Sequence, residues 1–156
     1  PLVPRPLDGL KYYYGIRGEV LRACLVRPRL TICDLCGTQA VFLLESAAAL
    51  RTLNLTDICR RLAEVLFYGE DIRLHFAAVS GDNALSVRSL LPDGSELAAC
   101  GEGAAAVAYT ARAAGLCDSD RIPVRMRGGS FCAELYGTKI SLCAKSEVIF
   151  AGEINY

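Results

Sequence analysis

The sequence lacks an excess of charge of either sign. Its 156 residues include 17 Lys and Arg residues and 17 Asp and Glu residues, so the formal net charge is zero. Proteins that bind nucleic acid usually carry a basic excess, and this chain has none. We therefore expect no nucleic acid among its partners.

Long apolar runs are also missing. No stretch approaches the roughly 18 uninterrupted apolar residues of a membrane-spanning helix. Residues 1–11 lack the apolar core of a secretory signal peptide. These absences predict a cytoplasmic protein that does not enter a membrane. In the reducing cytosol its eight cysteines are expected to be free thiols.

Metal ligands are scarce in this sequence. His75 is the only histidine, and its alternating strand pattern favours a packed or edge position over catalysis. Cys33 and Cys36 have Cys-x-x-Cys spacing, but a zinc site needs two further ligands and no second such pair exists. A thioredoxin-like motif opens a helix, whereas here Gly37 follows at once. We expect no metal site.

What the sequence does contain is apolar side chain in regular patterns. Hydrophobic residues make up 53% of the chain and charged residues 22%, which is enough to fill a core. A helix capped by Thr56 is predicted to run to Phe67. Strands are predicted over residues 11–27, 39–44, 72–79, 84–91, 122–126, 130–136, 139–143 and 147–151. We expect a single α+β domain over residues 1–156, with antiparallel or mixed strands around one central helix.

The expected central helix covers about residues 100–115. Its residues from Ala104 to Ala114 are mostly alanine, so the helix is small or apolar on nearly every side. Such a helix is buried on most sides. Gly115 is a good left-handed stop at its end.

Two glycines, Gly101 and Gly103, lie in the first turn of this helix, although each costs about 1 kcal/mol relative to alanine. Close approach of a ligand to the backbone would explain them. The first amides of a helix are unpaired and attract an anion such as an α-carboxylate. The same donors are expected to lower the pKa of Cys100, which could then act as a proton-transfer base and, where exposed, alkylate faster than the other thiols. A buried, inert cysteine beside a tight turn is the other interpretation.

A family resemblance supports the first interpretation, in which Cys100 transfers a proton. The stretch Asp93-Gly94-Ser95-Glu96 followed by Cys100-Gly101-Glu102-Gly103-Ala104 resembles the Asp-Gly-Ser-Glu…Cys-Gly-x-Gly-Ala signature of diaminopimelate epimerases and related amino-acid racemases. Residues 37–42 look like a shortened Gly-Asn-Pro-His-Ala-Val-Phe. Residues 148–154 are similar to the family's closing Val-Phe-Glu-Gly-Glu-Ile. The resemblance spans about residues 33–154, in the order of the family's second domain.

The resemblance implies a cofactor-independent isomerase of the kind used in lysine biosynthesis. Family members have two similar domains, each giving one cysteine to opposite faces of the substrate's α-carbon, without metal or pyridoxal phosphate. Cys100 would be one catalytic cysteine, and Gly101, Glu102 and Gly103 would hold the α-carboxylate. Thr38 and Arg73 stand where the family has substrate-binding asparagines.

The chain also departs from the family pattern. Glu102 replaces Asn, Ser or Thr, and its charge would repel a substrate carboxylate unless the side chain turns away. In the family's second domain a Glu-Arg pair precedes the cysteine motif, and Leu91-Pro92 stands in its place here. The second cysteine-bearing domain must come from a homodimer or from a first domain outside this chain. The competing hypothesis is a paralogue that kept the fold, lost catalysis and serves as a binding or structural module.

Overall fold

The computed structural model describes residues 30–66, 71–81, 83–137, 139–148 and 150–153. Its strands are β1 (Thr31–Asp34), β2 (Thr38–Leu43), β3 (Ile72–Val79), β4 (Leu85–Leu90), β5 (Glu96–Leu97), β6 (Arg121–Met126), β7 (Gly129–Tyr136) and β8 (Lys139–Ala144). Its helices are α3 (Ala47–Thr52), α4 (Leu55–Leu66) and α5 (Gly101–Ala113). The strand prediction over residues 11–27 lies outside the described residues.

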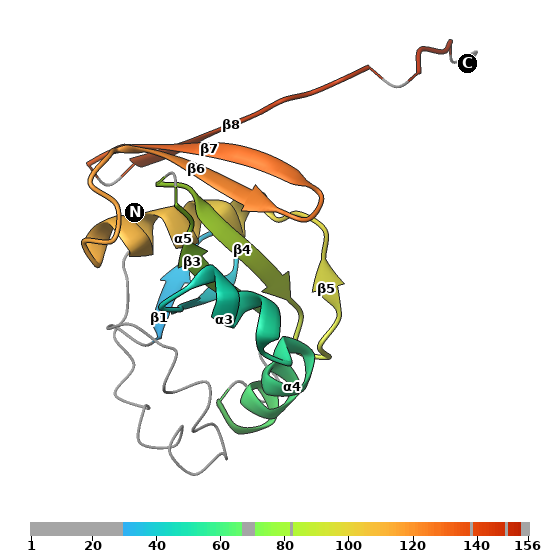
Figure 1. The fold of residues 1–156 in the computed structure, drawn as a ribbon. Helices are drawn as coiled ribbons and strands as arrows, with labels where there is room; N and C mark the ends of the chain where they lie inside the picture. The colour runs from blue at the N-terminus through green and yellow to red at the C-terminus, as the bar shows by residue number, and fades with distance from the viewer. Residues whose placement is uncertain (1–29, 67–70, 82, 138, 149, 154–156) are drawn as a thin grey trace.

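The strands form one mixed sheet in the order β1-β2-β3-β4-β6-β7-β8, with β5 paired to β4. The pairs β2–β3 and β4–β6 are parallel, and the other neighbours are antiparallel. Figure 1 shows this sheet with α5 against one side and with α3 and α4 towards the other end of the molecule.

Side-chain alternation divides the core between the two faces of the sheet. On one face, Ala40, Phe42, Leu74 and Phe76 pack with residues of α3 and α4. The rings of Phe42 and Phe76 stack there with centroids 4.8 Å apart. On the other face, side chains of β2, β3, β4, β6 and β7 pack against α5. The central strands are therefore buried on both faces, whereas the outer face of β6, β7 and β8 is largely exposed.

The central helix is as predicted. Helix α5 contacts β2, β3, β4, β6, β7 and β8, so the sheet curves around it as a half-barrel. Its alanines at positions 104, 105, 106, 108 and 111 are all buried. Small side chains let several strands approach one helix closely, because no long side chain holds them apart. After the helix, Gly115 has φ +72°, the left-handed conformation expected of a helix stop. The α+β prediction with strands around one central helix is confirmed.

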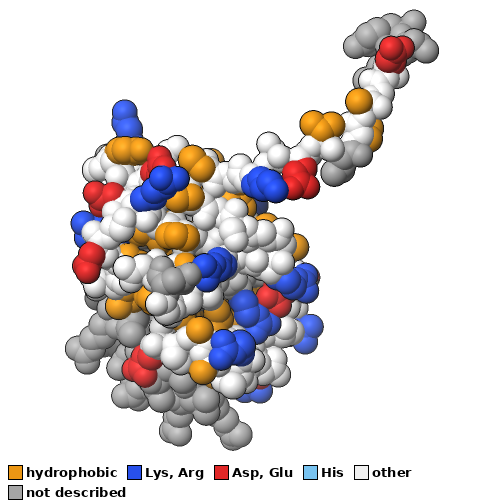
Figure 2. All heavy atoms as spheres, turned by 45° about the horizontal axis from the view of Figure 1, so that its top comes forward, with side chains coloured by type: hydrophobic (Ala, Val, Ile, Leu, Met, Phe, Trp, Pro, Cys, Tyr) orange, Lys and Arg blue, Asp and Glu red, His pale blue; other side chains and the backbone are white. Residues whose placement is uncertain are grey.

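The structure corrects several local predictions. Helix α4 is capped by Asn54 rather than Thr56, because the Asn54 side chain accepts the Asp57 amide at 3.3 Å. The short elements β1, α3 and β5 were not predicted. Residues 147–148 and 150–151 form no strand, and they extend away from the body (Figures 1 and 2). Val148 and Phe150 are 90% and 81% exposed on this segment.

None of the helices in the described ranges is long and apolar enough to cross a membrane.

Candidate functional site

The sulfur of Cys100 lies at the start of α5. Cys100 is the N-cap residue, and its Sγ accepts the Gly103 amide at 3.3 Å. Its own amide donates to the Met126 sulfur at 3.2 Å. The Gly128 amide donates to the Ala98 carbonyl at 2.7 Å, so the end of β6 fastens the chain that leads into the helix. The thiol is fixed in position and only 7% exposed.

Two amides beside this sulfur are available to a ligand. The Gly103 and Ala104 amides are used by the Cys100 sulfur and carbonyl. Those of Gly101 and Glu102 have no hydrogen-bond acceptor in the described part of the chain. Both residues are half-buried. Unpaired amides at the positive end of a helix form an anion site.

Glu102 brings a negative charge to the same place. Its Oε2 atom lies 3.7 Å from the Cys100 sulfur, so the thiol can donate to the carboxylate. The side chain therefore turns towards the sulfur, and a bound anion would meet this charge as well as the amides.

The expected lowering of the Cys100 pKa is wrong for this structure. Burial raises the pKa of the Cys100 thiol, and the Glu102 charge raises it further. The Gly103 amide and the Arg73 charge act in the opposite direction, but burial is the largest influence on this pKa. Cys100 is therefore a protonated thiol near neutral pH.

Beneath the first turn of α5 lies a buried polar network that the sequence did not reveal. The Gln39 amide nitrogen donates to the Leu35 and Gly37 carbonyls, at 3.2 Å each. Its Oε1 atom must then accept from His75 Nε2, 2.8 Å away. Burial lowers the pKa of His75 to about 3, so the imidazole is neutral near pH 7 and carries its proton on Nε2. His75 Nδ1 then accepts a hydrogen bond from the Ser89 hydroxyl, 2.8 Å away.

This imidazole explains Gly103. A Cβ atom at position 103 would lie 2.6 Å from His75 Nδ1 and 2.9 Å from Nε2, and closer still to Cε1. A Cβ at Gly101 would meet only Leu142 Cδ1, at 3.7 Å, an ordinary contact. The reason predicted for both glycines, close approach of a ligand, is therefore not needed at Gly103, where internal packing excludes a side chain.

Arg73 and Thr38 occupy different faces of the sheet. Arg73 shares the face of His75 and Ala77, which is the α5 face, and its charge acts on the Cys100 pKa. Thr38 alternates with Gln39 and shares the face of Ala40 and Phe42, which pack in the other cluster. The structure brings Arg73, Gly101, Glu102 and Gly103 to the Cys100 sulfur, and it does not bring Thr38 there.

The polar residues before Cys100 are used within the fold. Glu96 forms a two-pronged ion pair with Arg88, with N–O distances of 2.9 and 2.8 Å. Asp93 accepts from the amide and hydroxyl of Ser95. Gly94 has φ +84° and packs against Thr56. These contacts give the Asp93–Glu96 part of the signature a structural role in fastening β4, β5 and the turn between them.

The described residues show no cluster of metal-ligating side chains. Among the described residues no three His, Cys, Asp or Glu side chains are placed to hold one ion. Cys33 is buried at the end of β1, 3.7 Å from the Thr110 hydroxyl, while Cys36 is exposed in the following turn.

Thiol exposure predicts an order of alkylation that replaces the order expected from the sequence. Cys36 and Cys143 are exposed, whereas burial raises the pKa values of Cys59, to about 12, and of Cys100. With limiting iodoacetamide near pH 7.5, Cys36 and Cys143 should be modified at least about tenfold faster than Cys100. Peptide mass spectrometry over time measures this order, and a urea-unfolded sample should equalise the rates. Labelling of Cys100 before Cys36 would contradict the buried, protonated thiol.

Solved structures with this fold include two proteins of the phenazine biosynthesis group. One is a phenazine biosynthesis protein of the PhzF family from Enterococcus faecalis, with a TM-score of 0.51 and 16% identity over 65% of this chain and 35% of that one. The other, from Clostridium difficile strain 630, is described as a phenazine biosynthesis PhzC/PhzF protein. Its TM-score is 0.52, with 13% identity over 96% of this chain and 54% of that one.

The likeness defines the class of fold. The mixed half-barrel around a central helix is the domain of PhzF-like and diaminopimelate epimerase-like proteins. At these identities the similarity is one of fold alone. No family model and no curated protein matches the sequence. The chain spans about a third to a half of the length of the structures that it resembles.

Proposed function

We propose that this chain provides one half of the active site of a cofactor-independent isomerase, which moves a proton at the carbon beside the carboxylate of an amino acid. The observation that carries the proposal is the position of the Cys100 sulfur beside the unpaired amides of Gly101 and Glu102. A substrate carboxylate held by these amides puts its α-carbon within reach of the thiol.

The protonation state of Cys100 assigns its role. Because burial raises its pKa, the thiol carries a proton near neutral pH and is suited to donating that proton to a carbanion. Arg73 adds a positive charge near the sulfur, which favours an anionic substrate and offsets part of the Glu102 charge. Gly103 contributes through its amide bond to Sγ and through its packing on His75.

Inversion at the α-carbon needs a base on the opposite face. In the proposed enzyme this base belongs to a second domain. A separate first domain would bring its own base, whereas another copy of the chain would take the proton with its Glu102 carboxylate, since its Cys100 is protonated as well. The exposed Val148 and Phe150 support the need for such a partner, since large apolar side chains on an extended segment are normally covered.

The contact between Cys100 and Glu102 favours a second candidate. A protonated thiol and a carboxylate 3.7 Å apart can give and take protons on the same face of a substrate. An isomerase of this kind needs no second face, because it takes a proton from one carbon of the substrate and returns it to another carbon on the same face. With an amino acid that cannot rearrange, it exchanges the α-proton without inverting the carbon.

Deuterium exchange in heavy water tests these proposals. The chain is incubated with a panel of amino acids that includes diaminopimelate. Loss of the α-proton signal is followed by NMR, and configuration by chiral chromatography. Cys100→Ala should lower the exchange rate about a hundredfold. Cys117→Ala is the matched control, because Cys117 is also buried but lies beyond the other end of α5.

The outcomes separate the candidates. Exchange with inversion supports the two-domain epimerase, and sedimentation then shows whether a dimer carries it. Exchange with retention supports the same-face isomerase. Full activity in Cys100→Ala would overturn the role assigned to Cys100, whereas no exchange with any substrate would leave the fold as a binding or structural module.

A further inference from the structure

Two cysteines face each other on the outer side of the sheet, away from α5. Cys132 on β7 and Cys143 on β8 are direct partners in the antiparallel register. Their chain neighbours Phe131, Ala133 and Leu142 turn inward to the α5 cluster, so alternation places both thiols on the outer face. Cys143 is exposed and Cys132 is half-buried. Neither thiol belongs to the site around Cys100.

The spacing of such a pair suits a disulfide. Residues directly opposite in an antiparallel pair have Cα atoms about 4.5–5.5 Å apart. Disulfides bridge Cα atoms about 4.4–6.8 Å apart, so the strands can stay in register when the bond forms. A bond on the solvent side of a sheet is also open to reductants, which makes it reversible.

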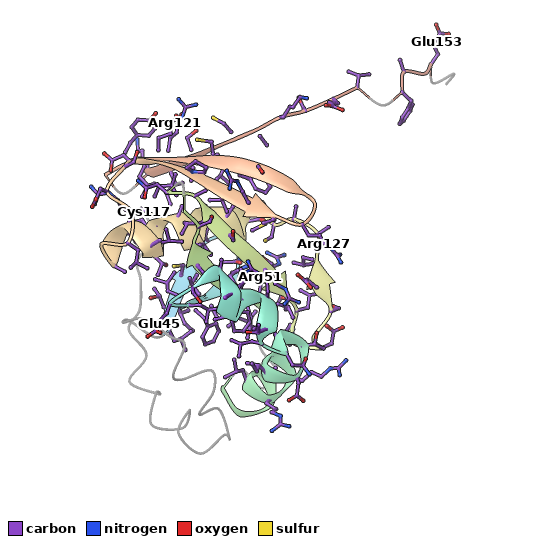
Figure 3. All side chains as sticks on the ribbon, in the orientation of Figure 1. Glu45, Arg51, Cys117, Arg121, Arg127 and Glu153 are labelled. Carbon is purple, nitrogen blue, oxygen red and sulfur yellow. The ribbon has the colours of Figure 1, made fainter. Side chains whose placement is uncertain are left out.

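Arg121 distinguishes the two thiols. Its Nε atom donates to the Cys132 sulfur at 3.3 Å and pairs with a Glu134 oxygen at 3.4 Å. Figure 3 shows Arg121 on the outer side of the β6–β7 ribbon, away from α5. The Arg121 side chain is exposed, so its positive charge attracts an anionic disulfide to the Cys132 sulfur. Cys132 is thus the first nucleophile and Cys143 the resolving thiol.

We propose that Cys132 and Cys143 form a reversible oxidation site for low-molecular-weight disulfides, such as oxidised glutathione. The Cys132 thiolate attacks one sulfur of the oxidant, whose S–S bond breaks and releases one glutathione thiolate. Cys143 loses its proton and attacks the Cys132 sulfur, which releases the second glutathione. The protein gives up two electrons and two protons, and the oxidant is reduced to two thiols.

Cys36 is the internal control for this proposal. It is exposed like Cys143, but the nearest cysteine in sequence, Cys33, is fully buried. Oxidised glutathione should therefore leave Cys36 as a mixed disulfide, while the cross-strand pair should resolve its own.

Mass spectrometry after treatment with oxidised glutathione tests the proposal. The native chain is quenched with N-ethylmaleimide and digested. The expected result is the loss of two hydrogen atoms across the Cys132 and Cys143 peptides, together with a glutathione adduct on Cys36. Dithiothreitol should reverse both changes. Cys143→Ser should trap glutathione on Cys132, and Arg121→Gln should slow the first step about fivefold.

Three results would overturn the proposal. Stable glutathione adducts on both Cys132 and Cys143 would show that the thiols cannot reach each other. A disulfide between two chains through Cys143 would replace the internal bond with an intermolecular one. If Cys132 reacted with oxidised glutathione equally fast in Arg121→Gln and in the wild type, Arg121 would not make Cys132 the first nucleophile. Circular dichroism of each variant confirms that the sheet is intact.

Discussion

Gly103→Ala is expected to lower the free energy of unfolding by about 3 kcal/mol. Exchanging glycine for alanine inside a helix normally stabilises it by about 1 kcal/mol, so the expected sign is the reverse of the usual one. The reason is the His75 ring, three atoms of which would lie within 3 Å of the added Cβ.

The ring has little freedom to move aside. His75 is fully buried, with one nitrogen bonded to Gln39 and the other to Ser89, at 2.8 Å each. Displacing it would leave buried polar atoms without partners, and each such atom costs about 1–3 kcal/mol. Moving α5 instead would disturb its packing against six strands.

Gly101→Ala is the matched control. The same change two residues earlier meets only the flexible end of Leu142 and should leave stability unchanged or raise it by up to about 1 kcal/mol. Urea unfolding followed by circular dichroism gives both values. Equal effects at the two positions would show that His75 does not press on α5 as the structure describes.

The central helix was predictable because its signals are local. A run of alanines, a cysteine at the cap and Gly115 at the stop lie within a stretch of sixteen positions, and the helix formed where they indicated. Helix α3 was missed because it is short, although Ser46 caps it by accepting the Ala49 amide at 3.2 Å. Such a cap is a weak signal when only six residues follow it.

The failed strand at residues 147–151 has a different cause. The β-branched and aromatic residues there favour an extended chain, and the described part of the segment runs straight out from the body (Figure 1). A strand, however, is stabilised by cross-strand partners, and the described part of this chain offers none at that point. Local propensity gave the conformation but not the pairing.

The candidate site was predicted in position but not in chemistry. Cys100 lies at a helix start as the glycine pattern indicated, yet its pKa depends on burial by distant strands, which the pattern does not contain. Gly103 was assigned to a ligand because its neighbour in space, His75, lies on β3, far away in the sequence. Short motifs reveal helix ends, whereas contacts beneath a helix come from the tertiary fold.

The buried imidazole also predicts a loss of stability in acid. Burial, aided by the positive charge of Arg73, lowers the pKa of His75 to about 3, whereas an unfolded chain has a histidine pKa of about 6.5. Between these values the unfolded state binds a proton that the folded state excludes. The free energy of unfolding should therefore fall by about 1.4 kcal/mol for each pH unit below 6.5, and by about 4 kcal/mol near pH 3.

A neutral replacement isolates this effect. His75→Gln removes the only histidine of the chain and leaves every carboxyl group in place. The acid titration of those carboxyls is common to both proteins, so it cancels in the difference between them. Urea unfolding at half-unit steps from pH 7 to pH 4 should show the wild-type advantage over His75→Gln shrinking by about 3 kcal/mol. Parallel curves for the two proteins would mean that the imidazole binds its proton in the folded state. That result would contradict the neutral state assigned to His75 in the network beneath the first turn of α5.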